Sequence, residues 1–294
     1  MKRMLALALA LIFCVGVCLL SACGKDEEPG EEAPPSETFE PTYELTEDGA
    51  GYILKKLKTD KADVQIPETY EGKPVVAIGD SALKDNKKIK SVVIPASVKS
   101  IGQSAFAGCT ALASVSFAEG LSEIGRFAFQ NCTALTAISL PASVRSIGKN
   151  AFNGCATLSS IAVAAGNTVY RAEGNCLIEI ASGTLLRGGK DSVIPADGSV
   201  LKIGDYAFAG VSGLIEIALP EGVLSLGYSA FENCISLAKI TLPESLERIG
   251  WYAFFDCISL LDVRFAGDAD AWENVLVDEA GNGRLLSITV QFGK

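Results

Sequence analysis

The chain has no histidine among its 294 residues. A Ser-His-Asp or Cys-His catalytic site is therefore excluded, and so is a zinc site that needs imidazole ligands. Positive charge is scarce as well, because 25 Lys and Arg face 35 Asp and Glu, for a net charge of −10. Without a basic surface, nucleic acid is not an expected partner.

Long apolar runs are also missing, except for one at the N-terminus. Lys2 and Arg3 precede an unbroken apolar segment of 17 residues, Met4 to Leu20. A short basic region followed by an apolar run is typical of a secretory signal peptide. The run reaches the lower length limit of a membrane-spanning helix, so an uncleaved anchor is the alternative.

The residues that end this run decide between the two interpretations. Leu20-Ser21-Ala22-Cys23 resembles the lipobox of bacterial lipoproteins, L-[ASTVI]-[GAS]-C. The resemblance implies a lipoprotein signal peptide over residues 1–23, with Cys23 acylated, for example by palmitate, and made the first residue by cleavage. Two or more acyl chains hold a protein firmly at a membrane, since each buried methylene contributes about 0.8 kcal/mol. The expected location is the extracellular face of the bacterial cell membrane.

Residues 24–41 have a composition unlike the rest of the chain. They contain seven Asp or Glu, one Lys and several prolines, and almost no apolar side chains. Such a segment buries too little surface to offset the entropy of ordering it. We expect a disordered acidic tether between the lipid and a folded domain at 42–294.

A phrase of 23 residues repeats through this domain. Its Ile-Gly or Leu-Gly pairs are Ile78-Gly79, Ile101-Gly102, Ile124-Gly125, Ile147-Gly148, Ile203-Gly204, Leu226-Gly227 and Ile249-Gly250. A fixed period of this length indicates a solenoid with one repeat per coil, each burying its apolar side against its neighbours. The pattern predicts repeats over residues 78–265.

The letters within one repeat predict the parts of a coil. The stretch 135–141, LTAISLP, alternates as a strand does, and such strands should pair in parallel about 4.8 Å apart. The VxxIG stretch predicts a second short strand or an extended turn, with its glycine at a positive φ or at a close contact between coils. The segment xxAFxxC should return as a short helical turn with Phe pointing inward. The fold class is thus a repeat solenoid, mainly β with short helical turns.

One coil is larger than the others, because 56 residues separate Ile147 from Ile203. Its extra segment lies at about 164–200. Cys176 to Ile180 and Thr184 to Arg187 are strand-like, and the three residues between them predict a hairpin turn. Ile194-Pro195 should then re-enter the column of main strands.

The repeats resemble the leucine-rich repeats of BspA-like surface proteins, whose phrase is close to AFxxCxxLxxIxLPxxvxxIG. The hairpin coil matches a variant of that family, residues 42–77 resemble its N-terminal cap, and residues 266–294, with Trp272, resemble its closing cap. Leu83, Asn86 and Val211 depart from the usual Phe or Cys. The resemblance implies attachment to host matrix or to other cells.

Six cysteines lie in the folded domain: Cys109, Cys132, Cys155, Cys176, Cys234 and Cys257. An even number in an exported protein suits disulfides. Five of the six, however, occupy one column of the repeat, where their Cβ vectors run parallel instead of converging. Free buried thiols are the favoured interpretation, with some disulfide bonding or a metal site as alternatives. No CxxC spacing supports a metal.

Two groups of outward residues in the last three coils are candidate binding residues. Exposed aromatic side chains are typical interface anchors. The candidates are Tyr206, Tyr228, Trp251, Tyr252 and Phe255 on the turns, and Lys239, Asp262 and Arg264 on the main strands. The alternatives are that the rings pack over the neighbouring Phe and that the charges are merely solvated. Asp268 and Asp270 leave room for a calcium role.

These features favour a non-enzymatic, membrane-anchored surface protein that binds an extracellular protein or glycan of a host or another bacterium. We expect it to be monomeric, with no cofactor and no metal. The alternative is a solute- or polysaccharide-binding component of an enzyme or transport system. That would need a concave pocket, for which the hairpin coil is the candidate place, lined by Tyr170, Arg171 and Arg187.

Overall fold

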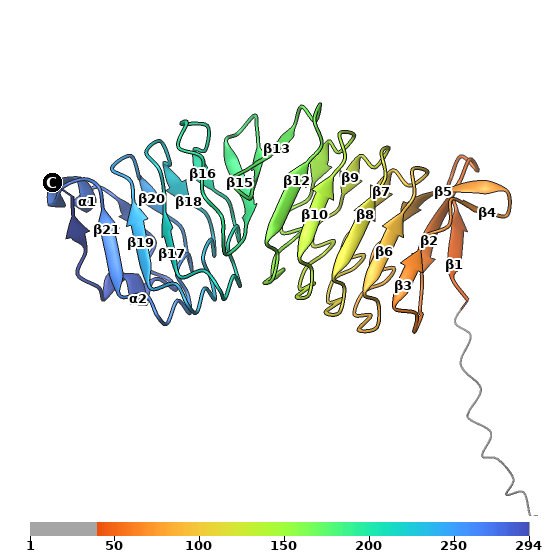
Figure 1. Cartoon of the computed structure of the whole chain (residues 1–294), viewed down its shortest axis with the longest axis horizontal. Coiled ribbons are helices and arrows are strands. Elements are labelled where there is room, and N and C mark those ends of the chain that lie inside the picture. Colours follow the sequence, from red (N-terminus) through yellow and green to blue (C-terminus); the bar gives the residue numbers. More distant parts are fainter. Residues whose placement is uncertain (1–39, 294) are drawn as a thin grey trace, which may run out of the picture. The chain divides into compact units, whose positions relative to one another are not determined.

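A computed structural model describes residues 40–293 of the chain. The predicted signal peptide with Cys23 lies outside the described residues, as does nearly all of the predicted tether. The described residues form one compact unit. This unit is a β-solenoid in which strands of successive coils lie edge to edge (Figure 1). Among the described residues, no helix is long and apolar enough to cross a membrane.

The coils up to Val163, here named the N-terminal stack, contain two sheets. The main strands are β3 (Asp63–Gln65), β6 (Ser91–Ile94), β8 (Ser114–Phe117), β10 (Ala137–Leu140) and β12 (Ser160–Val163). The other sheet has β1 (Thr42–Leu45), β2 (Tyr52–Lys56), β4 (Thr69–Tyr70), β5 (Lys73–Ile78), β7 (Ser100–Ile101), β9 (Glu123–Ile124) and β11 (Ser146–Ile147). Strands β2 and β3 lie within the predicted N-terminal cap, and each already belongs to one of the two sheets. The cap therefore contains a coil of its own.

The coils from Lys202 onward, here named the C-terminal stack, repeat this arrangement. The main strands are β17 (Glu216–Ala218), β19 (Lys239–Leu242), β21 (Asp262–Phe265) and β23 (Gln291–Phe292). The other sheet continues from the enlarged coil through β16 (Lys202–Ile203), β18 (Ser225–Leu226), β20 (Arg248–Ile249) and β22 (Leu276–Val277). The closing cap adds helices α1 (Ala269–Glu273) and α2 (Gly283–Leu286).

The enlarged coil between the stacks carries three antiparallel strands. They are β13 (Tyr170–Glu173), β14 (Cys176–Glu179) and β15 (Thr184–Gly188), and β15 then pairs in parallel with β16. The predicted hairpin is confirmed, and β13 is an addition to it. The predicted return to the main strands is wrong: Ile194 is buried, but it lies outside any strand. The sheet of main strands therefore ends at β12 and starts again at β17.

Residues 23 positions apart in the chain lie side by side in the parallel ladders. Ser91 pairs with Ser114, for example, and Thr241 with Arg264. The inward Phe rings stack in the same way, with centroids 5.1 Å apart for Phe106 and Phe129. The core divides into two hydrophobic clusters that correspond to the two stacks and meet at the enlarged coil.

The repeated glycines allow the backbones of neighbouring coils to approach closely. The positive φ, which was the other possibility for these glycines, occurs at a different position of the repeat. A Cβ on Gly125 would lie 2.7 Å from the carbonyl carbon of Gly102, and one on Gly148 would lie 2.4 Å from the amide of Arg126. The left-handed residue is the second after each of these glycines, with φ between 53° and 61°: Ser81, Ser104, Phe127, Asn150, Tyr206, Ser229 and Tyr252.

The segment xxAFxxC forms hydrogen-bonded turns, so the predicted helical turn is wrong. Alternate amides of the turn donate to the next coil instead of to their own. Phe127 N reaches Lys149 O at 3.1 Å, Phe129 N reaches Ala151 O at 2.8 Å, and Asn131 N reaches Asn153 O at 2.8 Å. A continuous helix would need those amides for its own carbonyls. We name this row of bonds the turn ladder.

Candidate functional site

The cysteine column lies inside the coils and is structural. All six cysteines of the described residues are free and buried, as the repeat predicted. Five thiols donate to the backbone carbonyl 26 residues earlier: Cys109 to Leu83, Cys132 to Phe106 and Cys155 to Phe129 at 3.2 Å, and Cys234 to Phe208 and Cys257 to Phe231 at 3.1 Å. Burial raises the pKa of the Cys109 and Cys155 thiols to about 11, so both stay protonated at neutral pH.

The aromatic candidates form a continuous row on the turns of the C-terminal stack. Ring centroids lie 5.3 Å apart for Tyr206 and Tyr228, 5.6 Å for Tyr228 and Tyr252, and 5.6 Å for Tyr252 and Phe255. Trp251 belongs to the same turn as Tyr252 and is 55% exposed. Burial, followed by the neighbouring Tyr228, raises the pKa of Tyr206 to about 12, so its hydroxyl remains a neutral donor. We name these five residues the aromatic row.

The charged candidates lie apart from the aromatic row, on main strands β19 and β21. Lys239 Nζ is 3.3 Å from a carboxylate oxygen of Glu216, and Arg264 lies 3.0 Å from Asp262. Within residues 40–293, no ring contact, hydrogen bond or ion pair joins them to the aromatic row. The structure thus places the predicted binding residues on two separate surfaces.

The acidic pair considered for calcium has a local structural role. Asp268 caps helix α1, since its Oδ1 accepts a hydrogen bond from Ala271 N at 2.8 Å. Asp270 lies in the first turn of the same helix. In the described part of the chain, no group of three His, Cys, Asp or Glu side chains is placed to hold a metal ion.

The turn ladder stops at the enlarged coil. In a regular coil three amides donate onward, but those of Asn150, Phe152 and Gly154 have no hydrogen-bond partner within residues 40–293. The next turn of the same type does not come until 205–210. Between them, β15 runs straight through the position where a turn would form. The chain between the turn at 149–154 and the turn at 205–210 therefore lacks the I-G-x-x-A-F turn that a further regular coil would have.

Arg187 of β15 spans this break. It is 1% exposed, its Nη2 donates to Cys155 O at 2.9 Å, and its Nη1 donates to Tyr206 O at 3.3 Å and Ala209 O at 3.1 Å. Its Nε has no partner. Burial lowers the pKa of the guanidinium, and no carboxylate of the described residues pairs with it to offset that burial.

A cavity of about 480 Å³ occupies the place of the missing turn. Its walls come from the last turn of the N-terminal stack, from β14 and β15, and from the first turns of the C-terminal stack. Polar lining residues are Lys149, Asn150, Asn153, Glu179, Thr184, Arg187, Lys202, Asp205, Tyr206 and Ser225. Ile147, buried at the equivalent position in other coils, is partly exposed here.

The pocket that the alternative function would need at the hairpin coil is therefore present, with a different lining. Arg187 lines it, whereas Tyr170 and Arg171 do not. Tyr170 is buried, and its hydroxyl accepts a hydrogen bond from Ile147 N at 2.9 Å. Strand β11 is the edge of its sheet, and this hydrogen bond replaces the one that Ile147 N would donate to a neighbouring strand.

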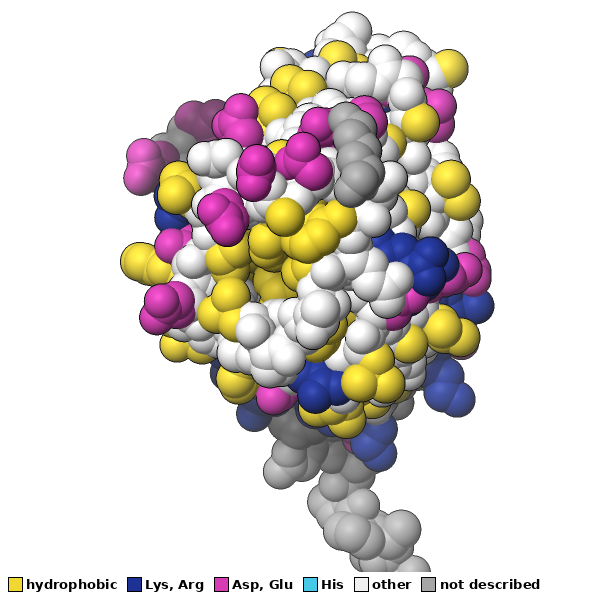
Figure 2. All heavy atoms as spheres, turned by 90° about the vertical axis from the view of Figure 1, so that its left-hand side faces the viewer, with side chains coloured by type: hydrophobic (Ala, Val, Ile, Leu, Met, Phe, Trp, Pro, Cys, Tyr) yellow, Lys and Arg dark blue, Asp and Glu magenta, His cyan; other side chains and the backbone are white. Residues whose placement is uncertain are grey.

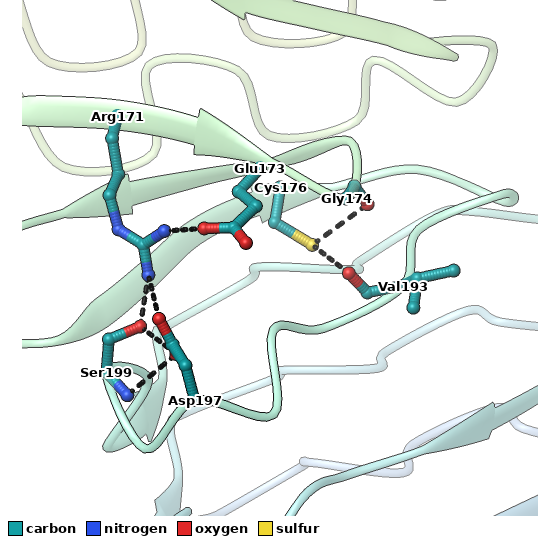
Figure 3. A network of polar contacts seen from close by, with 7 residues as sticks. All are labelled: Arg171, Glu173, Gly174, Cys176, Val193, Asp197 and Ser199. Carbon is teal, nitrogen blue, oxygen red and sulfur yellow. Dashed lines mark hydrogen bonds and ion pairs between the residues drawn. The ribbon is translucent and has the colours of Figure 1, made fainter.

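Arg171 instead fastens the hairpin to the loop that follows it. From β13 its guanidinium contacts Glu173 on the same strand and the hydroxyl of Ser199, and it lies 3.9 Å from Asp197 (Figure 3). In the same view, the sixth thiol, Cys176, faces the carbonyl of Val193 at 3.9 Å. Both contacts tie β13 and β14 to the strandless segment before β16.

The C-terminal end of the solenoid carries an apolar patch. Figure 2 shows hydrophobic side chains gathered over this end of the molecule. The exposed large residues of the cap are Leu276, Leu286 and Phe292. Trp272, predicted as a cap residue, packs its ring 5.2 Å from Phe265 and so closes the core beneath the patch.

The fold and these surfaces define a β-solenoid of the leucine-rich-repeat class. The family described as "BspA type Leucine rich repeat region" matches in six copies, over residues 76–179 and 190–274. Since these ranges cover more than half of the chain, the chain belongs to that family.

Solved structures agree in fold. A leucine-rich repeat protein from Eubacterium ventriosum is 21% identical, with a TM-score of 0.57, over 76% of this chain and 69% of that one. The pneumococcal vaccine antigen PcpA is 22% identical, also with a TM-score of 0.57, over 71% of this chain and 60% of its own. Among curated proteins, none matches this sequence.

Proposed function

We propose that this protein is a lipid-anchored bacterial surface protein that binds an extracellular protein or glycan without catalysing a reaction. The aromatic row is the observation that carries the proposal. Four of its five rings are between 36% and 55% exposed. Large apolar side chains held outside a core that could bury them are typical of interfaces.

The geometry of the row suits a partner that lies along the solenoid. Four of its rings, those of Tyr206, Tyr228, Tyr252 and Phe255, contact one another in succession across three coils, so they form one extended surface. The equivalent turns of the N-terminal stack carry mostly polar side chains, such as Gln103 and Arg126. A partner would therefore meet anchors at one end of the solenoid only.

Partner binding is tested first by capture of host proteins and glycans on the purified chain, and then by variants. Tyr228→Ser with Trp251→Ser should weaken binding of the captured partner about thirtyfold or more, since such anchors commonly contribute at least about 2 kcal/mol each. Gln103→Ser with Arg126→Ser, in the same column upstream, is the matched control. Unchanged binding by the aromatic variant, or loss of its folding, would contradict the proposal.

Membrane attachment is tested separately at Cys23. The lipobox resemblance of residues 20–23 predicts that Cys23→Ala leaves an uncleaved precursor without the acyl chains. Fractionated cells should show the parent as a lipid-modified, shortened chain. If the variant is processed and membrane-bound in the same way as the parent, the apolar run and not the lipid is the anchor.

A second candidate function is the binding of a small solute at the enlarged coil. The cavity of about 480 Å³ is the observation that favours it, because its volume lies within the range of small-molecule sites. Such a site would operate alongside the aromatic row, not in its place.

A further inference from the structure

The cavity at the enlarged coil is rich in donors that the fold leaves unused. On one wall, Asn150 and Phe152 line the gap left by the missing turn, and their amides have no partner in residues 40–293. In the other coils the same amides are bonded, as Phe129 N is to Ala151 O of the next turn and, in the last coil, Phe254 N is to Asn282 Oδ1. A molecule that fills the gap must therefore supply hydrogen-bond acceptors for these two amides.

Arg187 adds donors of the same kind from the floor of the cavity. A guanidinium has five N–H groups, and the three bonds to Cys155, Tyr206 and Ala209 leave Nε–H and one N–H of Nη2. A carboxylate can accept from these two positions at once. An unpaired buried cation is costly, and a bound anion would offset that cost.

The charged lining residues indicate how much negative charge fits. Three cations, Lys149, Lys202 and Arg187, lie on the walls with two acids, Glu179 and Asp205. Both acids are engaged, Glu179 by the Ser182 hydroxyl at 2.6 Å and Asp205 by Tyr228 N at 2.9 Å. One net positive charge remains, which a monoanion neutralises and a doubly charged phosphate exceeds.

We infer that this cavity binds a carboxylate, carried either by a small molecule or by the end of a short peptide. Its two oxygens take the free donors of Arg187, and further acceptors on the ligand take the amides of Asn150 and Phe152. The inference rests on the second candidate function and names the chemistry of its ligand. It is independent of the aromatic row.

The test is calorimetric titration of the full chain in a non-ionic detergent with four probes. Acetate and N-acetyl-dialanine carry one carboxylate, and N-acetyl-dialanine amide is the neutral match of the latter. Succinate carries two carboxylates and therefore exceeds the net charge of the lining. We expect at least one carboxylate to bind, with the amide weaker by about tenfold or more. If acetate binds and N-acetyl-dialanine does not, the ligand is a small molecule. If N-acetyl-dialanine binds much more tightly than acetate, the ligand is the end of a peptide.

Two variants locate the site. Ser225→Trp fills the cavity from its wall and should reduce the affinity about tenfold or more, whereas Ser100→Trp, at the same place in a regular coil, should not. Lys149→Gln with Lys202→Gln removes two exposed cations without touching the core and should also weaken binding. Equal binding of acid and amide would show a solute site of another chemistry. Binding that survives both variants, or no binding of any probe, would overturn the inference.

Discussion

The regular coil from Ile124 to Ile147 and the longer segment from Ile147 to Ile203 both begin with an I-G-x-x-A-F turn and differ after it. In the regular coil, the turn buries Phe129 and passes three amides on to the next coil. After the turn at 149–154 of the longer segment, a hairpin takes up the extra length, and no second turn of this type forms before 205–210. Arg187 then supplies, from a side chain, some of the bonds that a backbone would have made.

This difference shows how a repeat protein acquires an irregular site. The interior columns of both stacks are nearly identical, so they specify the solenoid and little else. One missing turn opens the ladder, exposes donors and leaves a cavity, while the hairpin joins the short-strand sheet of the C-terminal stack through the pairing of β15 with β16. Specific chemistry thus arises at the departure from the repeat.

The largest effect is expected from the Phe stack of a regular coil. Phe129 is fully buried between Phe106 and Phe152, with parallel rings on both sides. Phe129→Ala should lower the free energy of unfolding by about 3–5 kcal/mol, because it leaves a cavity in the stack. Urea unfolding followed by circular dichroism measures this.

The matched control lies two residues earlier in the same turn. Phe127 is only partly buried and has a left-handed backbone, with φ of 58°. Phe127→Asn should therefore change the stability little, because Asn tolerates this conformation better than Phe does. Similar losses for both variants would mean that the stack is not what holds the coil.

A smaller effect is expected where the backbones of regular coils touch. A Cβ on Gly125 would lie 2.7 Å from the carbonyl carbon of Gly102. Gly125→Ala should cost about 1–3 kcal/mol, because the coils must separate to admit a methyl group. Gly283→Ala is the control, since no atom lies within 4 Å of its added Cβ. If both changes are harmless, close packing does not explain the glycine column.

The buried thiols predict a dependence of stability on alkaline pH. Burial raises the folded-state pKa of Cys109 and Cys155 to about 11 from the ordinary value of 9.0. A thiol whose pKa is raised by folding stabilises the fold below its unfolded pKa, and this contribution is lost as the pH rises. The unfolding free energy should fall between about pH 9 and about pH 11, and less steeply after Cys109→Ala and Cys155→Ala. Equal slopes would refute this cause.

The smallest effect is expected from charge pairs on the strand surface. Lys239 and Glu216 lie 3.3 Å apart across neighbouring coils and are both exposed. A double-mutant cycle with Lys239→Ala and Glu216→Ala should give a coupling of about 0–1 kcal/mol. A coupling well above this range would show that surface charge, and not the interior columns, joins the coils.

Much of this architecture can be predicted from the repeat itself. The 23-residue period predicts the solenoid, its buried columns and the alternating strands, because every coil buries the same apolar positions against its neighbours. The hairpin of the enlarged coil follows from its two strand-like stretches. The cysteine column likewise predicts thiols that stack without pairing.

The departures from the repeat are harder to predict, for physical reasons. The left-handed position carries Ser, Phe, Asn or Tyr instead of Gly, so no residue type marks it. The bonds that replace a helix join residues 22 apart, which a local pattern does not show. Arg187 looks like an ordinary strand residue in the sequence. The sequence marks its unusual position in one way: residues 185–189, LLRGG, stand where the other coils have the Ala-Phe pair of their turn.

Hydrogen exchange at the break tests the central claim most directly. The account predicts that the amides of Asn150, Phe152 and Gly154 exchange about a hundredfold faster than those of Phe127, Phe129 and Asn131, the same positions in the preceding coil. Bonded amides within a core exchange only when the structure opens, whereas unbonded ones need no such opening. Measured residue by residue, equal protection of the two sets would contradict a ladder that ends at the enlarged coil.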